Sequence, residues 1–312
     1  MSMRVLVTGA DGFVGKHLSR HLRARGDDVF EVRGPDTGAA TASDHADHAG
    51  LGLDILDAGA LARAVDEYRP EGIVHLAGWS SVAQSHADPA KAFAVNVLGT
   101  VHLLEAVRKH AAKARVVLVS SGEVYGKMPS GEKATEATPA APVSPYAASK
   151  LAAEMAGVQF FHSYGIEAIC ARPFNHLGAG QAPHFVVPSF ARQLQSIRRG
   201  DGNTRLEVGN LEPVRDFSHV ADVVEAYRVL LRSGVAGEAY NIGSGHGRTI
   251  RSIVDELRAL LGVEVEPTVV AERFRPAEIE SLVGDASKLR ALGWEPRHTV
   301  TEALREVLRE VE

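Results

Sequence analysis

The glycine-rich segment from Thr8 to Gly15 limits the possible folds of this chain more than any other feature. It follows an apolar run that is typical of a short strand, and a helical pattern begins at Val14. Glycines in such a strand-to-helix turn let backbone N–H groups approach a pyrophosphate at the helix N-terminus. The residues that we expect to contact this ligand are Gly9, Asp11, Gly12, Phe13, Val14 and Gly15.

Strand-like and helical patterns then alternate through the first half of the chain. Short, fully apolar strands separated by helices indicate a parallel sheet that is covered on both faces. Right-handed crossovers give a doubly wound sheet with ligands at the carboxyl ends of its strands. We expect strands at 4–8, 28–33, 52–53, 73–77, 116–120 and 167–172, and helices at 14–25, 58–68, 89–110 and 145–164.

The pattern changes after residue 172, where short mixed segments replace the regular alternation. Helical patterns remain at 220–232, 250–261 and 301–311. We therefore predict an α/β fold, with a Rossmann-type doubly wound parallel sheet and a smaller C-terminal substrate-binding region. An NAD(P)-binding domain is expected over residues 1–172 and the C-terminal region over 173–312, with a return of the chain to the sheet left open.

The charge of the chain gives no support for a nucleic-acid or membrane partner. Its 312 residues contain 34 Lys and Arg against 39 Asp and Glu, a net charge of −5. No signal peptide or membrane-spanning run is recognised, and the single cysteine, Cys170, cannot form an internal disulfide. We therefore expect a cytoplasmic protein. His45 and His48 lie in a polar loop without further ligands, so no metal site is expected.

The end of the second expected strand bears on the choice of dinucleotide. An acidic residue there would hydrogen-bond the ribose 2′-hydroxyl of NAD, whereas a basic residue suits the 2′-phosphate of NADP. Arg33 holds this position, which favours NADP(H), although an arginine that meets only solvent is the alternative. Asp36 keeps NAD(H) possible. Asp54 and Ile55 are expected to bracket the adenine, and Leu76, Ala77 and Gly78 to pass beneath the cofactor.

Tyr146 and Lys150 are the candidate catalytic pair. They stand four residues apart, which places a phenol and an ammonium group on one face of a helix. A nearby lysine favours the phenolate and brings the tyrosine pKa toward the working range. Ser121 follows a predicted strand and is placed to hydrogen-bond the reacting oxygen. The three residues together predict a site for proton and hydride transfer.

With these motifs, the sequence resembles the extended short-chain dehydrogenase/reductase family, which contains nucleotide-sugar epimerases, dehydratases and reductases. The resemblance covers essentially the whole chain and includes residues 96–100 and 172–176. The segment from Pro173 to Gln181 is most similar to enzymes that act on GDP-mannose derivatives. The resemblance implies a nucleotide-sugar substrate, with a GDP-sugar favoured, and a homodimer formed through the helices at 89–110 and 145–164.

The resemblance also assigns substrate contacts. Asn175 would touch the sugar diphosphate, Arg215 would clamp the diphosphate, and Arg275 with Glu278 would bind the nucleoside. Surface salt bridging is the alternative for both arginines. The full set of residues expected at the substrate is Ser80, Ser121, Glu123, Asn175, Val187, Arg192, Arg215, Arg275 and Glu278, and Pro173 joins Tyr146 and Lys150 at the cofactor.

The triplet Ser121, Gly122 and Glu123 bears on the reaction. Similar dehydratases carry a polar middle residue that helps to eliminate water, and Gly122 has no side chain to donate a proton. Glu123 stands at the position of the dehydratase base, so dehydration stays open. For a reductase we expect Tyr146 to protonate the new alkoxide, Ser121 to orient the carbonyl and Lys150 to hold the nicotinamide ribose.

The favoured expectation is NADPH-dependent reduction of a 4-keto-6-deoxy nucleotide sugar, GDP-4-keto-6-deoxy-D-mannose to GDP-D-rhamnose. Nucleotide-sugar 4,6-dehydration of GDP-mannose and C4 epimerisation are the alternatives. A non-catalytic dinucleotide-sensing module is a remote one. Such relatives usually lose the tyrosine or the lysine, and this chain retains both with Ser121.

Overall fold

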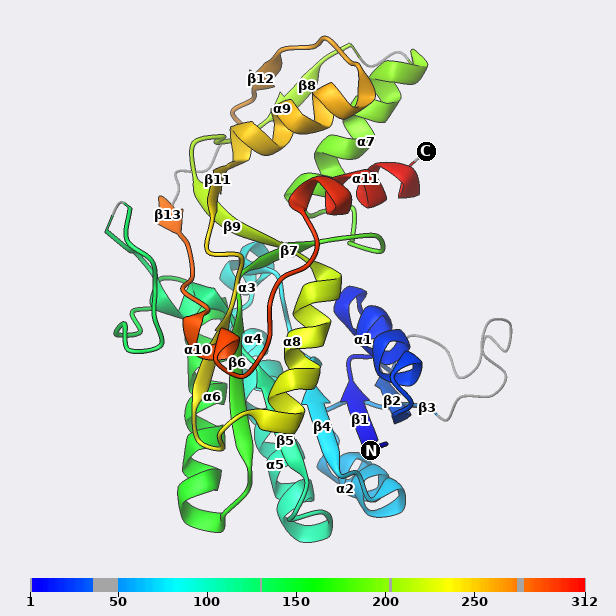
Figure 1. The fold of residues 1–312 in the computed structure, drawn as a ribbon, viewed down its shortest axis with the longest axis vertical. Coiled ribbons are helices and arrows are strands. Elements are labelled where there is room, and N and C mark those ends of the chain that lie inside the picture. Colours follow the sequence, from blue (N-terminus) through cyan, green and yellow to red (C-terminus); the bar gives the residue numbers. More distant parts are fainter. Residues whose placement is uncertain (1, 36–49, 130, 202–203, 274–277, 312) are drawn as a thin grey trace.

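A seven-stranded parallel sheet forms the centre of the lower lobe in Figure 1. The computed structural model describes residues 2–35, 50–129, 131–201, 204–273 and 278–311. Every strand pair in this sheet is parallel, so all carboxyl ends meet at one edge. The strands lie in the order β10 (Ala239–Ile242), β6 (Ala168–Pro173), β5 (Arg115–Val119), β4 (Gly72–His75), β1 (Arg4–Thr8), β2 (Asp28–Arg33) and β3 (Gly50–Gly52).

Helices cover both faces of the sheet because the strands are apolar on both sides. In β1, Val5 and Val7 pack into one core while Leu6 packs into the other. The first core is closed by α1 (Phe13–Ala24) and α8 (Val220–Ser233). The second is closed by α2 (Ala58–Tyr68), α5 (Gly99–His110) and α6 (Pro145–Tyr164). The predicted Rossmann-type α/β architecture is confirmed.

The helix expected at 89–110 consists of three pieces. They are α4 (Pro89–Phe93), a π-helical turn η1 (Ala94–Leu98) and α5. Pro89–His110 has a mean hydropathy of 1.3 over its most apolar window, and 44% of that window is buried. By length and composition alone this helix could span a membrane, contrary to the sequence-based expectation, but in the structure it packs against α2 and α6.

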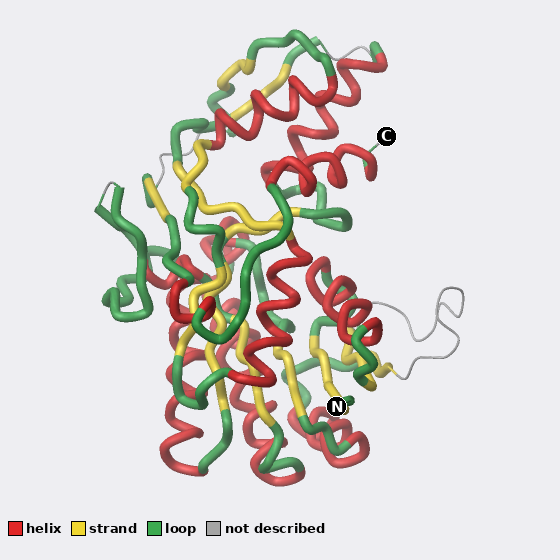
Figure 2. The backbone as a smooth tube through the Cα atoms, in the orientation of Figure 1, coloured by secondary structure: helices red, strands yellow, loops and turns green. Residues whose placement is uncertain are grey.

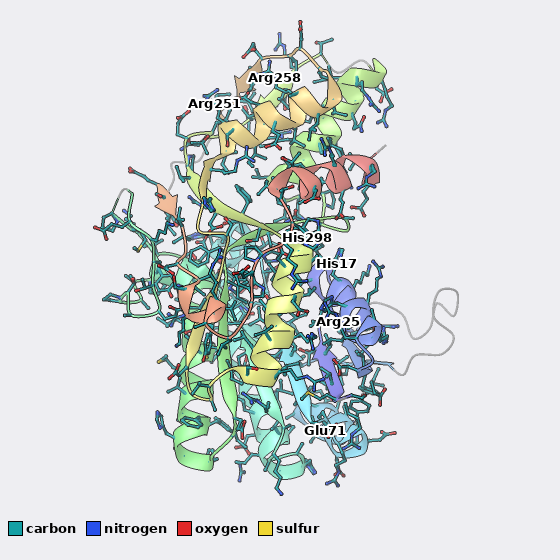
Figure 3. The ribbon with its side chains drawn as sticks, viewed as in Figure 1. His17, Arg25, Glu71, Arg251, Arg258 and His298 are labelled. Atoms are coloured by element: carbon teal, nitrogen blue, oxygen red, sulfur yellow. The ribbon has the colours of Figure 1, made fainter. Side chains whose placement is uncertain are left out.

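The upper lobe has its own apolar core. Figure 2 shows the helices and short strands of this lobe beyond the large sheet. Three helices enclose this core: α7 (Val186–Arg199), α9 (Ile250–Leu261) and α11 (Val300–Glu310). Figure 3 shows Arg251 and Arg258 on α9 at the far end of this lobe, and His17 and His298 at the junction of the lobes. The strands of the lobe are β7 (Asn175–Leu177), β8 (Leu206–Val208), β9 (Val214–His219), β11 (Gly247–Thr249), β12 (Pro267–Val269) and β13 (Ser281–Leu282).

The chain does not stay in the upper lobe after residue 173. Helix α8 returns to cover one face of the large sheet, and β10 pairs with β6 as its outer strand. The return that the sequence left open therefore takes place. Helix α7 was not expected, and the short elements α3 (Val82–Ala87), η2 (Gly122–Tyr125) and α10 (Ser287–Arg290) complete the chain.

Candidate active site

A cleft of about 1020 Å³ lies along the carboxyl ends of the sheet strands. It extends from the glycine-rich turn before α1 to Tyr146 and Lys150, the candidate catalytic pair on α6. A cleft of this size is in the range of cofactor and ligand sites. All residues that the sequence assigned to the cofactor line it: Gly9, Asp11, Gly12, Phe13, Val14, Gly15, Arg33, Asp54, Ile55, Leu76, Ala77, Gly78, Tyr146, Lys150 and Pro173.

The glycine-rich turn is packed so closely that side chains would not fit. Gly9 has a φ of +69°, and a Cβ there would lie 2.7 Å from the backbone nitrogen of Ala77. A Cβ at Gly15 would collide with the backbone of Gly9 and Ala10. The first turn of α1 is thereby held against β1 with its N-terminus open to the cleft. This cradle suits the pyrophosphate of a dinucleotide.

Arg33 lies at the end of β2, on the border of the cleft. Its guanidinium Nη2 donates to the Glu31 carboxylate at 2.6 Å, and Arg23 Nη1 donates to the same carboxylate at 2.7 Å. Burial would raise the pKa of Glu31, but the hydrogen bonds from Arg33 and Arg23 lower it overall. Glu31 is therefore an anion that orients Arg33 at the strand end. Asp36 lies outside the described residues, as do His45 and His48.

Helix α6 places Tyr146 and Lys150 because its first turn is well capped. The Ser144 hydroxyl accepts from Ala147 N at 3.1 Å, and the Ser85 hydroxyl of α3 accepts from Tyr146 N at 3.1 Å. One turn on, the Lys150 ammonium donates to the carbonyl oxygen of Val119, at the end of β5, at 2.8 Å. The capped helix and this hydrogen bond fix the pair over the end of the sheet.

The protonation states of the pair follow from their surroundings. Burial raises the pKa of Tyr146 to about 12, a side-chain hydrogen bond with Ser121 lowers it, and Glu123 raises it. Burial lowers the pKa of Lys150 to about 8, although Glu154 raises it. The expected lowering of the tyrosine pKa by Lys150 is not seen here, and the Lys150 ammonium group donates to the Val119 carbonyl. At neutral pH Tyr146 is a protonated phenol that can act as an acid.

A side chain at position 122, beside Ser121, would crowd the ring of Phe174. A Cβ at this position would lie 3.0 Å from the Cδ1 and Cε1 atoms of Phe174. The Phe174 ring is buried and stacks near Tyr125, with ring centroids 6.3 Å apart. The proton-donating side chain that Gly122 lacks is therefore replaced in space by an aromatic ring.

Glu123 is the carboxyl group at the catalytic end of the cleft. Burial raises its pKa, the charge of Arg215 lowers it, and Glu278 raises it. Arg215 is half-buried and donates to the carbonyl oxygens of Val214 and Ile279, each at 2.9 Å. The expected substrate residues Glu123, Arg215 and Glu278 are thus close enough to influence one another.

Comparison with known proteins agrees with this geometry. The family model described as GDP-mannose 4,6 dehydratase matches residues 6–307. The chain belongs to this family. The expected membership of the extended short-chain dehydrogenases is thereby confirmed.

Relatives of this family member catalyse different reactions. GDP-6-deoxy-D-mannose reductase of Pseudomonas aeruginosa is 36% identical over 99% of this chain and 97% of its own length. A solved structure of RMD from Pseudomonas aeruginosa with NADPH has a TM-score of 0.85 at 35% identity, covering 99% of both chains. UDP-glucose 4-epimerase of Thermus thermophilus with NAD has a TM-score of 0.88 at 34% identity, covering 99% of both chains.

The other substrate residues expected in this family member are dispersed. Ser80, Ser121 and Asn175 line the cleft with Glu123, whereas Arg215 and Glu278 do not line it and act on Glu123 through their charges. Val187 is buried in the core of the upper lobe, and Arg192 lines a separate cavity of about 370 Å³. In α7 it is Val186 that lines the cleft, and Arg192 lies more than one helical turn further on, so the substrate roles of Val187 and Arg192 stay predictions. Arg275 lies outside the described residues.

Asn96 is a site residue to which sequence reasoning gave no role. Its side-chain oxygen accepts from Trp79 N at 2.7 Å, and its amide nitrogen donates to Ser149 Oγ at 2.9 Å. It lies in the π-helical turn η1, and such turns often mark functional sites. Asn96 thereby joins the loop after β4 to the helical turn that carries Tyr146 and Lys150.

The cleft also has aromatic and imidazole walls that were not foreseen. Phe13 stacks on His176 with ring centroids 6.0 Å apart, and His184 and Phe185 lie near its substrate end. The sequence motif around residue 175 indicated a binding site in this region. It did not indicate that the rings of Phe13 and His176 would stack. Across the described ranges, no group of three or more His, Cys, Asp or Glu side chains is placed to hold a metal ion.

Proposed function

We propose that this chain is an NADPH-dependent reductase of a 4-keto-6-deoxy nucleotide sugar, with GDP-4-keto-6-deoxy-D-mannose as substrate and GDP-D-rhamnose as product. The observation that carries the proposal is the packing of Phe174 against Gly122. Position 122 has no side chain that could help to eliminate water from the sugar, and the Phe174 ring lies against it. The similarity to GDP-6-deoxy-D-mannose reductase supports the substrate class.

The residues of the site can perform each protein-dependent part of this reduction. Ser121 orients the C4 carbonyl, and the protonated Tyr146 donates its proton to the carbonyl oxygen as the alcohol forms. Lys150 holds the nicotinamide ribose, and solvent restores the tyrosine proton. When bound, NADPH supplies the hydride that reaches C4 and leaves as NADP⁺. The site roles of Ser121, Tyr146 and Lys150 are part of this proposal.

The preference for NADP(H) over NAD(H) is supported by Arg33 at the end of β2. Guanidinium and phosphate groups match in geometry, and the Glu31 carboxylate already orients the guanidinium. The NADPH-bound structure of RMD from Pseudomonas aeruginosa is a second support. The NAD-bound epimerase keeps NAD(H) as the alternative.

A 4,6-dehydratase acting on GDP-mannose is the second candidate, because Glu123 is present and burial raises its pKa. A carboxyl group with a raised pKa can move a proton at neutral pH. C4 epimerisation is a further alternative. A non-catalytic dinucleotide sensor is disfavoured by the intact set of Ser121, Tyr146 and Lys150.

One experiment separates the reductase from the dehydratase. Purified enzyme is incubated with NADPH and GDP-4-keto-6-deoxy-D-mannose while absorbance at the nicotinamide band is followed. Stoichiometric oxidation of NADPH with formation of GDP-rhamnose is expected. Water loss from GDP-mannose without added cofactor, together with no NADPH oxidation by any 4-keto nucleotide sugar, would favour the dehydratase.

The protein is also proposed to be a homodimer. Apolar side chains on neighbouring α4, η1 and α6 are exposed to solvent in the single chain. Some of them lie in Pro89–His110, the helix that is apolar enough to span a membrane. A dimer interface would also explain why this helix is so apolar. The exposed side chains are Phe93 (41%), Leu98 (47%), Met155 (51%) and Tyr164 (51%).

A further inference from the structure

Tyr227 has an unusual environment for a tyrosine in the core of the lower lobe. Its side chain is fully buried in the core between α1, α8 and the sheet. Its hydroxyl oxygen has no hydrogen-bond partner among the described residues. A buried hydroxyl without a hydrogen-bond partner is destabilising, so a partner outside the chain is expected.

The other two fully buried tyrosines show the contrast. The Tyr125 hydroxyl donates to Asn241 Oδ1 at 2.7 Å, and the Tyr240 hydroxyl accepts from Val235 N at 3.0 Å. Neither lines the cleft, whereas Tyr227 does. The tyrosine without a protein partner is therefore the one that borders the ligand site.

The direction of α8 explains how a core side chain reaches the cleft. The helix precedes β10, which runs parallel to β6, so the N-terminus of α8 lies toward the carboxyl edge of the sheet (Figure 1). Side chains on a helix point toward its N-terminus. A side chain of α8 is therefore directed along the sheet face toward the carboxyl edge, and Tyr227 lines the cleft at that edge.

The position of α8 also indicates which part of the cleft Tyr227 reaches. The helix packs on β4, β5 and β6, while Arg33 marks the adenosine end at β2. Tyr227 is close enough to Tyr146 for the Tyr146 side chain to act on it electrostatically. Burial, and then Tyr146, raise the pKa of Tyr227, so its hydroxyl keeps a proton to donate.

We propose that the Tyr227 hydroxyl donates a hydrogen bond to the nicotinamide half of the bound dinucleotide, as a cofactor-binding residue in the floor of the cleft. This inference rests on the cofactor part of the proposed function. It makes α8, which belongs to the second half of the sequence, a part of the cofactor site.

The test is the substitution Tyr227→Phe, with Tyr240→Phe as the matched control. Binding of NADPH is measured by titration of nicotinamide fluorescence, and thermal unfolding is followed without ligand. Tyr227→Phe is expected to raise the Kd for NADPH about 5- to 10-fold while leaving the melting temperature without ligand unchanged or higher. Tyr240→Phe loses a bond within the protein, so it should melt earlier and bind NADPH like the wild type.

Adenosine 2′,5′-bisphosphate locates the contact within the cofactor. Tyr227→Phe should bind this fragment, which has no nicotinamide half, as the wild type does. Equal losses for the fragment and for NADPH would contradict the placement. Unchanged NADPH binding, or a fold lost or weakened as in the control, would overturn the role of Tyr227. A wild-type protein that binds neither NADPH nor NADH would instead overturn the proposed function, and this inference with it.

Discussion

The Phe174 ring occupies the space into which a side chain at position 122 would extend. A Cβ on Gly122 would lie 3.0 Å from two ring carbons, which is closer than side-chain carbons normally approach. Gly243 and Gly284 also face this ring, so three glycines surround it. The Phe174 ring and the missing side chain of Gly122 therefore belong to one packing arrangement beside Ser121.

Substitution of Gly122 by alanine is expected to destabilise the protein by about 1–3 kcal/mol, because the added methyl group must displace a buried ring. Gly52→Ala is the control, since its Cβ would meet only Gly34 O at 3.8 Å. That change should stay within about 0.5 kcal/mol of the wild type in urea unfolding. Equal free energies of unfolding for the two variants would show that the Phe174 ring can move aside without a loss of stability.

Gly122→Asp is expected to form no keto sugar from GDP-mannose, since the Phe174 ring crowds the space that a side chain at position 122 would need beside Ser121. Product formation is followed by chromatography of the nucleotide sugars. Appearance of the keto sugar with the single variant would contradict the assigned role of this packing.

Tyr146→Phe removes the proposed acid and keeps the ring. Reductive turnover is expected to fall about 10²- to 10⁴-fold, the usual contribution of acid–base catalysis. Binding of NADPH should survive, as measured by fluorescence titration. Turnover at the wild-type rate would mean that another group supplies the proton.

The pH profile of reduction should reflect two groups shifted in opposite directions. The pKa of Tyr146, about 12, keeps its proton in place, and the pKa of Lys150, about 8, removes its charge within the accessible range. Reductive kcat/KM should therefore be level near neutral pH and decline above about pH 8 as Lys150 loses its proton. The reverse oxidation, which needs the phenolate, should gain with rising pH.

A control for this profile is Lys150→Arg, because arginine stays charged at high pH. The variant is expected to be slower throughout but to lose the decline above about pH 8. A decline that remains at the same pH would assign it to a different group.

Arg33→Asp is expected to weaken NADPH binding by about ten- to a hundredfold, the loss of one charge-assisted contact, and to shift preference toward NADH. The new carboxylate would lie beside Glu31 and repel a 2′-phosphate. Arg309→Asp changes the net charge equally on the exposed surface of α11 and should leave the ratio of the two Kd values unchanged. An unshifted ratio for Arg33→Asp would show that Arg33 does not contact the phosphate.

The proposed dimer is tested with Leu98→Glu combined with Met155→Glu. Two charges placed on the exposed apolar face should give monomers in light scattering, because an interface core does not tolerate unpaired charge. Val235→Glu is the control, a side chain that is equally exposed (51%) but lies after α8. Monomeric wild-type protein would refute the proposal directly.

Sequence patterns predicted the elements of the lower lobe well because each has a local cause. Apolar runs define β1 and β2, and the Ser144 cap with the following apolar residues defines α6, all three with the expected bounds. Periodicity reports burial along one segment, and it needs no knowledge of the rest of the chain.

Contacts between distant segments could not be predicted in this way. The packing of Phe174 on Gly122 joins residues from two strand ends, and Tyr227 becomes a cleft residue only because α8 returns to the sheet. In α7, the distinction between Val186 and Val187 depends on the rotation of a helix that the sequence did not reveal. Each of these is decided by tertiary packing rather than by local pattern.

The return of the chain to the large sheet limits how this protein can evolve. Cutting after residue 172 would remove β10 and α8, which are part of the sheet and of its cover. Asp222 of α8 further ties down the segment before α11 by accepting from the backbone N–H groups of Arg297 and His298, each at 3.0 Å. Exchanging everything after residue 172 as one cassette would therefore also remove a strand and a covering helix from the large sheet.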